Sequence, residues 1–207
     1  MEHLTLSHRV YTPAGILPNL KNLKRAEFVN VEFHKGHADL LSRSPLVTLN
    51  ISYNPVCRGD FFWCFKEHPG LIARLQHLEI CAACPAGTCC NEIRHFFSSM
   101  RESDDTFRLE SADICLDDIS SIAIELITRF LHDKCRKTLR TLKMRGMYFA
   151  RDLIFPALES LTVMGFIYQS PSLHVNGFST RPCFPNLKTL RIQGVGREDI
   201  VTSAPFS

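Results

Sequence analysis

The chain lacks the features that mark several large classes of protein. It has no long apolar run and no low-complexity tract, and its 207 residues are 45% hydrophobic and 22% charged, as in a folded globular body. No apolar segment approaches the length of a membrane span. The first residues, including Glu2, His3 and His8, contain neither a basic region nor an apolar core, so we expect no secretory signal and no membrane partner. The expected location is the cytoplasm or the nucleus.

Signatures of catalysis and of nucleic-acid binding are missing as well. The sequence contains no GxSxG, GxxxxGK[ST], GxGxxG or HExxH motif, and its nine histidines are scattered. The net charge of +3 and the pI of about 8.4 are too mild to indicate a nucleic-acid footprint. We therefore expect no enzymatic activity, no cofactor and no nucleic-acid partner.

What the chain does contain is a recurring LxxLxL pattern, an apolar residue followed three and five positions later by two more. Five clear copies begin at Leu46, Leu75, Leu139, Leu158 and Leu187. The first leucines of successive copies are 29, 64, 19 and 29 residues apart. This periodicity predicts an α/β fold of the leucine-rich-repeat type: a solenoid with a curved parallel β-sheet inside and helices and loops outside.

Weaker copies extend the repeat. Leu4 with Leu6 opens the chain, and Phe107 with Leu109 supplies a strand inside the long gap, while the register of the unit near Leu20 and Leu23 stays open. About eight irregular units therefore occupy residues 1–195, and residues 196–207 form a tail or the start of a further repeat, with a helix indicated at 197–201. Proline precedes several copies, as in Pro156-Ala157-Leu158, and we expect it at the first residue of a strand.

Helical periodicity appears between the predicted strands. The clearest helix spans Asp117 to Cys135, with apolar residues on one face and Asp117 or Asp118 as its cap. Shorter helices are predicted at residues 37–43, at 61–68 ending before Pro69-Gly70, and at 92–100 capped by Asn91. From Gly165 to Phe184 the pattern predicts a long loop. The aromatic run at 61–65 is expected to be buried between repeats, or else to dock a partner on the convex side.

The units at residues 135–144 and 184–192 resemble the irregular repeats of F-box leucine-rich-repeat proteins. In that family an F-box near the amino terminus binds a Skp adaptor of a cullin complex, and the solenoid captures a substrate for ubiquitin transfer. No F-box is visible, because the strand pattern begins by Leu4. The resemblance therefore implies the substrate-receptor part of such a ubiquitin ligase. The alternative is a stand-alone repeat scaffold without a ubiquitin link.

The candidate binding site is the concave face, because strand residues alternate and those between the buried leucines point outward. The candidate partner-binding residues on that face are Glu79, Arg108, Lys143, Arg145, Arg191 and Gln193. Arginines bind carboxylate and phosphate in a bidentate manner, so the expected partner is a protein segment that is acidic or phosphorylated. The competing interpretation is an ordinary solvated face, since every solenoid exposes charges on its strands.

A second alternative concerns the nine cysteines. Cys81, Cys84, Cys89 and Cys90 lie within ten residues and together offer four thiolates for zinc. Adjacent Cys89 and Cys90 strain the tetrahedral geometry, however, and free cysteines commonly act as small buried apolar residues. We therefore predict no metal and keep a zinc-binding module at 81–90 as the alternative.

Overall fold

The fold of the chain is a single open sheet covered by helices on one face. The computed structural model describes residues 1–7, 20–31, 35–54, 65–83, 90–117, 119–149, 152–169, 183–193 and 200–202. Its strands are β1 (His3–Ser7), β2 (Arg25–Val29), β3 (Thr48–Asn54), β4 (His77–Ala83), β5 (Ser111–Asp117), β6 (Thr141–Phe149), β7 (Ser160–Gln169), β8 (Thr189–Gln193) and β9 (Ile200–Thr202). Its helices are α1 (Lys35–Ser42), α3 (Pro69–Ala73), α4 (Cys90–Glu102) and α5 (Ser121–Phe130), which continues into the π-helix η2 (Leu131–Cys135).

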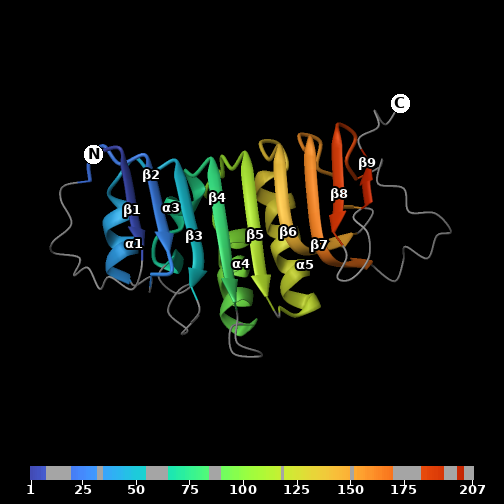
Figure 1. The fold of residues 1–207 in the computed structure, drawn as a ribbon, viewed down its shortest axis with the longest axis horizontal. Coiled ribbons are helices and arrows are strands. Elements are labelled where there is room, and N and C mark those ends of the chain that lie inside the picture. Colours follow the sequence, from blue (N-terminus) through green and yellow to red (C-terminus); the bar gives the residue numbers. More distant parts are fainter. Residues whose placement is uncertain are drawn as a thin grey trace.

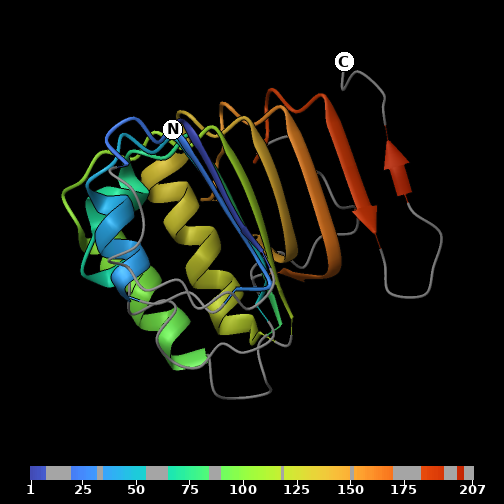
Figure 2. The same ribbon diagram turned by 60° about the vertical axis from the view of Figure 1, so that its left-hand side comes forward.

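The strands lie side by side in chain order from β1 to β9 (Figure 1). The first eight are parallel, and β9 pairs antiparallel with β8. Figure 2 shows α1, α4 and α5 together on one side of this sheet. The predicted α/β class with parallel strands in one open sheet is therefore confirmed.

The leucines of the repeated pattern form the core. The residue two positions before each of β2 to β8 is buried: Leu23, Leu46, Leu75, Leu109, Leu139, Leu158 and Leu187. Two further apolar residues on each of β2 to β7 are buried on the side of the sheet where the helices lie, including Leu49 and Ile51 on β3. Alternate strand residues thus face the core, which removes their apolar surface from water and stabilises the stack.

One backbone carbonyl in each unit joins it to the next. Arg140 accepts hydrogen bonds from the amides of Glu159 (2.8 Å) and Ser160 (3.0 Å) at the start of β7. The same paired arrangement recurs with the carbonyls of Glu2, Lys24, Val47, Gln76, Glu110 and Glu159. The spacing of these acceptors varies from 19 residues (Arg140 to Glu159) to 34 (Gln76 to Glu110), yet the geometry is constant. The repeat is therefore regular in hydrogen bonding even where its length is irregular.

The fifth strand lies elsewhere than predicted. Phe107 and Leu109 precede β5, and the strand itself begins at Ser111 with Ala112 and Ile114 facing the core. Leu109 is thus the counterpart of Leu75. Ala112 occupies the first buried position of the strand itself, where most other units have a larger residue. The register left open near Leu20 resolves in favour of Leu23, because β2 buries Ala26 and Phe28.

Several predicted boundaries are also wrong. The helix expected from Asp117 starts later, because Asp117 ends β5 and Ser120 caps α5 by accepting a hydrogen bond from the Ala123 amide (3.3 Å). The helical residues described at 65–66 do end before Pro69, as predicted, but Pro69 itself begins α3, since proline suits the first helical turn where no amide partner is needed. Helix α4 already includes Cys90 and therefore begins before the predicted cap.

Errors of the same kind affect the turns and the carboxyl-terminal part. Pro156 lies in a turn in which the Leu158 amide donates to the Phe155 carbonyl (3.3 Å), not in a strand. The predicted loop from Gly165 begins too early, because β7 continues to Gln169 through a positive φ of 81° that glycine adopts easily. Residues 200–202 form a strand where a helix was indicated.

Burial of the aromatic run is confirmed for Phe65, and residues 61–64 lie outside the described part of the chain.

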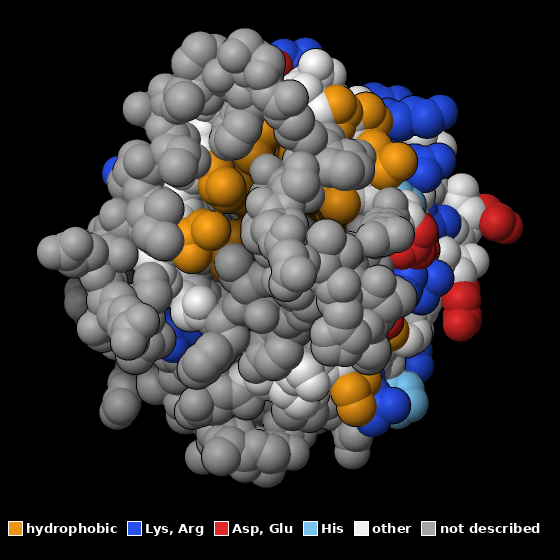
Figure 3. All heavy atoms as spheres, turned by 90° about the vertical axis from the view of Figure 1, so that its right-hand side faces the viewer, with side chains coloured by type: hydrophobic (Ala, Val, Ile, Leu, Met, Phe, Trp, Pro, Cys, Tyr) orange, Lys and Arg blue, Asp and Glu red, His pale blue; other side chains and the backbone are white. Residues whose placement is uncertain are grey.

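The outer surface of the helices carries ion pairs between successive units. Arg101 Nε of α4 lies 2.8 Å from Asp133 Oδ2 of η2, and Lys35 Nζ of α1 lies 2.5 Å from Glu67 Oε2. In Figure 3, which faces the β9 end, charged side chains gather on the right, the side on which the helices lie. This helix-covered face is an ordinary solvated surface.

Candidate functional site

The face of the sheet opposite the helices, which we call the open face, presents the residues that alternate with the buried ones. Its middle row is defined by one residue from each parallel strand, placed side by side by the register: Thr5, Glu27, Asn50, Glu79, Asp113, Lys143, Thr162 and Arg191. The next row toward the carboxyl ends of the strands contains Ser7, Val29, Ser52, Cys81 and Cys115, followed by Arg145, Met164 and Gln193. Residues distant in sequence are thus neighbours on one surface.

Five of the six predicted partner-binding residues lie on this face. Glu79, Lys143 and Arg191 belong to the middle row, and Arg145 and Gln193 lie one step beyond it. Each comes from a strand whose leucine pattern was clear in the sequence.

The placement of Arg108 on the open face is wrong. Arg108 precedes β5, its side chain is exposed, and its backbone amide donates to the Ala73 carbonyl (3.0 Å) beside α3. The displaced strand also changes which residues are presented. Asp113 occupies the open-face position predicted for Arg108, between Glu79 and Lys143, and Cys115 lies beside Cys81 in the next row.

The amino-terminal half of the middle row is acidic. Glu27 accepts a hydrogen bond from Arg25 Nε (2.8 Å), and this bond is the main reason why the pKa of Glu27 is lowered. Glu79 accepts a hydrogen bond from Asn50 Nδ2 (2.7 Å). Burial raises the pKa of Glu79, and the negative charge of neighbouring Asp113 adds to that effect. These carboxylates are therefore held in place by neighbours on the same face.

Asp113 joins the acidic half of the open face to the basic half. Its Oδ2 accepts a hydrogen bond from Lys143 Nζ (2.7 Å), and its Oδ1 accepts one from Cys115 Sγ (2.9 Å). The bond to Asp113 raises the pKa of Lys143. Because Arg108 lies elsewhere, the predicted basic residues on the open face are Lys143, which pairs with Asp113, and Arg145 and Arg191 on β6 and β8.

Two cysteines also meet on the open face. Cys81 of β4 lies opposite Cys115 of β5 in the parallel register, next to Asp113. The hydrogen bond between the thiols lowers the pKa of Cys81 and raises that of Cys115. Residues 84–89 lie outside the described part of the chain, so the predicted alternative site at 81–90 is not observed as a whole. Sequence spacing missed Cys115, because finding it requires the correct register of β5.

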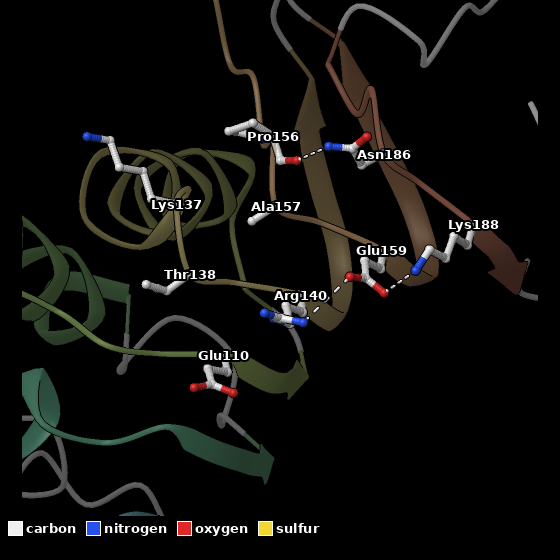
Figure 4. A pocket seen from close by; sticks show the side chains of 9 residues that line it. All are labelled: Glu110, Lys137, Thr138, Arg140, Pro156, Ala157, Glu159, Asn186 and Lys188. Carbon is white, nitrogen blue, oxygen red and sulfur yellow. Dashed lines mark hydrogen bonds and ion pairs between the residues drawn. The ribbon is translucent and has the colours of Figure 1, made fainter.

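A shallow hollow of about 480 Å³ lies at the edge of the sheet where β6, β7 and β8 begin (Figure 4). Glu159 stands between two cations there: Lys188 Nζ lies 2.7 Å from its Oε2 and Arg140 Nη1 lies 3.8 Å from its Oε1. The bond from Lys188 is the main cause of the lowered pKa of Glu159. Glu110 and Lys137 add one more charge of each sign. A lining of mixed sign does not select an ion of one charge, so the open face is the stronger candidate site.

Within the described residues, no helix combines the length and the hydrophobicity needed to cross a bilayer. Comparison of the chain with protein-family models, with curated proteins and with solved structures finds no match.

Proposed function

We propose that the chain is an irregular leucine-rich-repeat solenoid whose open face binds a partner protein. The observation that carries the proposal is the contrast between the two faces of one sheet. The leucine-lined face is buried on the side where the helices lie, whereas the opposite face presents ordered rows of polar and charged side chains that no described helix covers. A rigid sheet with such a face is suited to binding an extended surface of another protein.

The repeat interpretation has two independent supports. The LxxLxL residues point into one shared core, as the repeat requires. The carbonyl that accepts two amides recurs from unit to unit, although the units differ in length. Both features are expected when each unit is one turn of a solenoid.

The partner chemistry is proposed from the charges on the open face. Arg145 and Arg191 are exposed on β6 and β8 and carry guanidinium groups suited to carboxylate or phosphate. An acidic or phosphorylated segment of the partner would therefore lie over β6 to β8. The acidic half of the face, including Glu27 and Glu79, would repel the same segment and so fix its orientation.

Membership of the F-box leucine-rich-repeat family, and with it recruitment of a ubiquitin ligase in the cytoplasm or nucleus, extends this proposal. Its support is the resemblance of the units at 135–144 and 184–192 to that family. Co-purification of Skp and cullin components with the natural full-length protein would support the ligase link. A partner bound without these components would favour the stand-alone scaffold.

The binding proposal is tested with a charge reversal and a matched control. The double variant Arg145→Glu with Arg191→Glu inverts the charge on the open face, whereas Arg108→Glu makes the same chemical change off that face. Partners captured by the tagged wild-type chain are identified by mass spectrometry, and their retention is measured over a range of salt concentrations. We expect the double variant to lose a salt-sensitive partner that Arg108→Glu retains. Equal retention by both variants would contradict the proposed face.

A further inference from the structure

The strongest unassigned feature of the open face is a cluster of three ligand-type side chains on its two central strands. Cys81 Sγ, Cys115 Sγ and a carboxylate oxygen of Asp113 all lie within 4.8 Å of one another. The two thiols come from β4 and β5, and Asp113 precedes Cys115 by two residues on the same face of β5. The cluster is therefore built on backbone that is fixed by neighbouring strands on both sides.

These thiols do not serve the hydrophobic core. Cys135 and Cys183 are buried among apolar residues, which is the usual structural role of a free cysteine. Cys81 and Cys115 are only partly buried, and they point to the face that also presents Glu79, Asp113 and Lys143. Packing does not explain two adjacent thiols in this polar setting.

We propose that Cys81, Cys115 and Asp113 bind one zinc ion. In tetrahedral zinc sites the Zn–S distance is about 2.3 Å and the Zn–O distance about 2.0–2.2 Å, which brings pairs of ligand atoms to within roughly 4 Å. The observed separations need to change little to reach that geometry. Three protein ligands leave the fourth position for water or for a donor from a bound partner, as in open zinc sites. Two thiolates favour zinc over magnesium or calcium, which prefer oxygen ligands.

The hydrogen bonds around the cluster are compatible with metal binding. Asp113 Oδ1 accepts the thiol proton of Cys115, while its Oδ2 accepts a hydrogen bond from Lys143. When zinc binds, both thiols lose their protons to solvent and two Zn–S bonds form. Asp113 Oδ1 no longer accepts a hydrogen bond from Cys115 and instead coordinates the metal. Lys143 continues to orient the carboxylate through Oδ2, and its positive charge offsets the single negative charge left by two thiolates, one carboxylate and Zn²⁺.

The site differs from the zinc alternative suggested by the sequence, because it uses Cys115 in place of Cys84, Cys89 and Cys90. It also goes beyond the proposed partner binding, since a metal can bind whether or not a partner does. The variant with Arg145→Glu and Arg191→Glu is therefore expected to keep its zinc affinity.

The test is a zinc titration of the purified full chain, first stripped of metal with a chelator and kept reduced. Wild-type protein is expected to bind one equivalent of Zn²⁺, and Co²⁺ in its place is expected to give thiolate-to-metal charge-transfer absorption. Cys115→Ser should weaken zinc binding at least 100-fold, and Asp113→Asn should weaken it by about 10–100-fold. Circular dichroism and the metal-free Tm of each variant verify that it remains folded.

The matched control is the double variant Cys89→Ser with Cys90→Ser, which removes two thiols outside the proposed site. It should bind zinc as the wild-type chain does. Unchanged zinc affinity in folded Cys115→Ser, or loss of zinc in the Cys89/Cys90 variant, would overturn the assignment. Failure of the wild-type chain to bind zinc would overturn it as well.

Discussion

Replacing Phe130 with alanine should strongly destabilise the centre of the helix layer. Phe130 ends α5, is 1% exposed, and lies where α5 continues into η2. Its ring centroid is 5.4 Å from that of Phe97 on α4 and 5.2 Å from that of Phe107, which precedes β5. One side chain therefore packs two helices against the segment that leads into the central strand β5, and its loss leaves a cavity lined by all three.

The expected cost follows from this packing. Truncation of a buried phenylalanine to alanine typically costs about 3–5 kcal/mol. Two ring pairs, each contributing about 0.5–1.5 kcal/mol beyond area burial, place Phe130→Ala in the middle of that range, at about 4 kcal/mol. For a chain of this size that corresponds to a Tm lowered by roughly 8–16 °C. Phe130→Leu retains most of the apolar volume and should cost about 1–1.5 kcal/mol.

The assay is urea denaturation followed by circular dichroism, with Ile122→Ala as the control. Ile122 lies on the same helix but is 52% exposed, so its truncation should change the free energy of unfolding by less than about 0.5 kcal/mol. The midpoint should shift in Phe130→Ala while the slope stays constant. If Phe130→Ala costs no more than Ile122→Ala, the aromatic cluster does not hold the two helices together.

Three further substitutions test local interactions. Ser120→Ala removes the cap that accepts from the Ala123 amide and should lower the free energy of unfolding by about 1 kcal/mol, whereas Ser120→Asp should restore it in the same urea assay. Arg74→Met removes the bonds from Nη2 to the carbonyls of Leu41 (2.8 Å) and Ser42 (2.9 Å) at the end of α1 and should cost about 2 kcal/mol, with no loss expected if α1 is held by apolar packing alone. Because burial raises the folded-state pKa of Glu79, the folded state binds this proton more tightly than the unfolded chain, and stability is lost as pH rises through the interval between the two pKa values. Glu79→Gln should therefore raise the Tm above that interval and leave it unchanged below the ordinary glutamate pKa, as thermal melts across pH will show.

The sequence was sufficient to predict the layers of the fold. Leucines at fixed spacing mark the buried positions before and within a strand, and this pattern survives large changes in the length of the connecting segments. The strand positions at Leu49, Leu78, Leu142, Leu161 and Leu190 follow from it directly. Helix boundaries were less predictable, because Pro69 begins a helix as readily as it follows one, and Ser120, Asp117 and Asp118 all have side chains able to cap.

The error at β5 has one physical cause. Ala112 is buried where β4 and β6 carry Leu78 and Leu142, so the strand does not display the full apolar pattern. Phe107 and Leu109 do display two apolar residues, but at positions that precede the strand. A pattern based on side-chain size cannot separate these alternatives, whereas pairing with both neighbouring strands does.

That single displacement explains most of what was missed on the open face. In a parallel sheet the neighbours of a residue are fixed by register, so moving β5 replaces Arg108 with Asp113 and brings Cys115 beside Cys81. Charge and metal-ligand chemistry then change together. The surface predicted to be basic is instead divided into an acidic and a basic half at the pair of Asp113 and Lys143. Two cysteines 34 residues apart in sequence become adjacent ligands.

The same reasoning separates the residues that maintain the fold from those that are free to change for binding. Each unit is joined to the next by backbone hydrogen bonds and by buried apolar side chains, and neither depends on the identity of the open-face residues. Substitutions at Thr162 or Arg191 should therefore leave stability within about 0.5 kcal/mol of the wild-type value. Because register alone holds these side chains in rows, such a face can be altered residue by residue to fit a partner or a metal while the sheet beneath it stays the same.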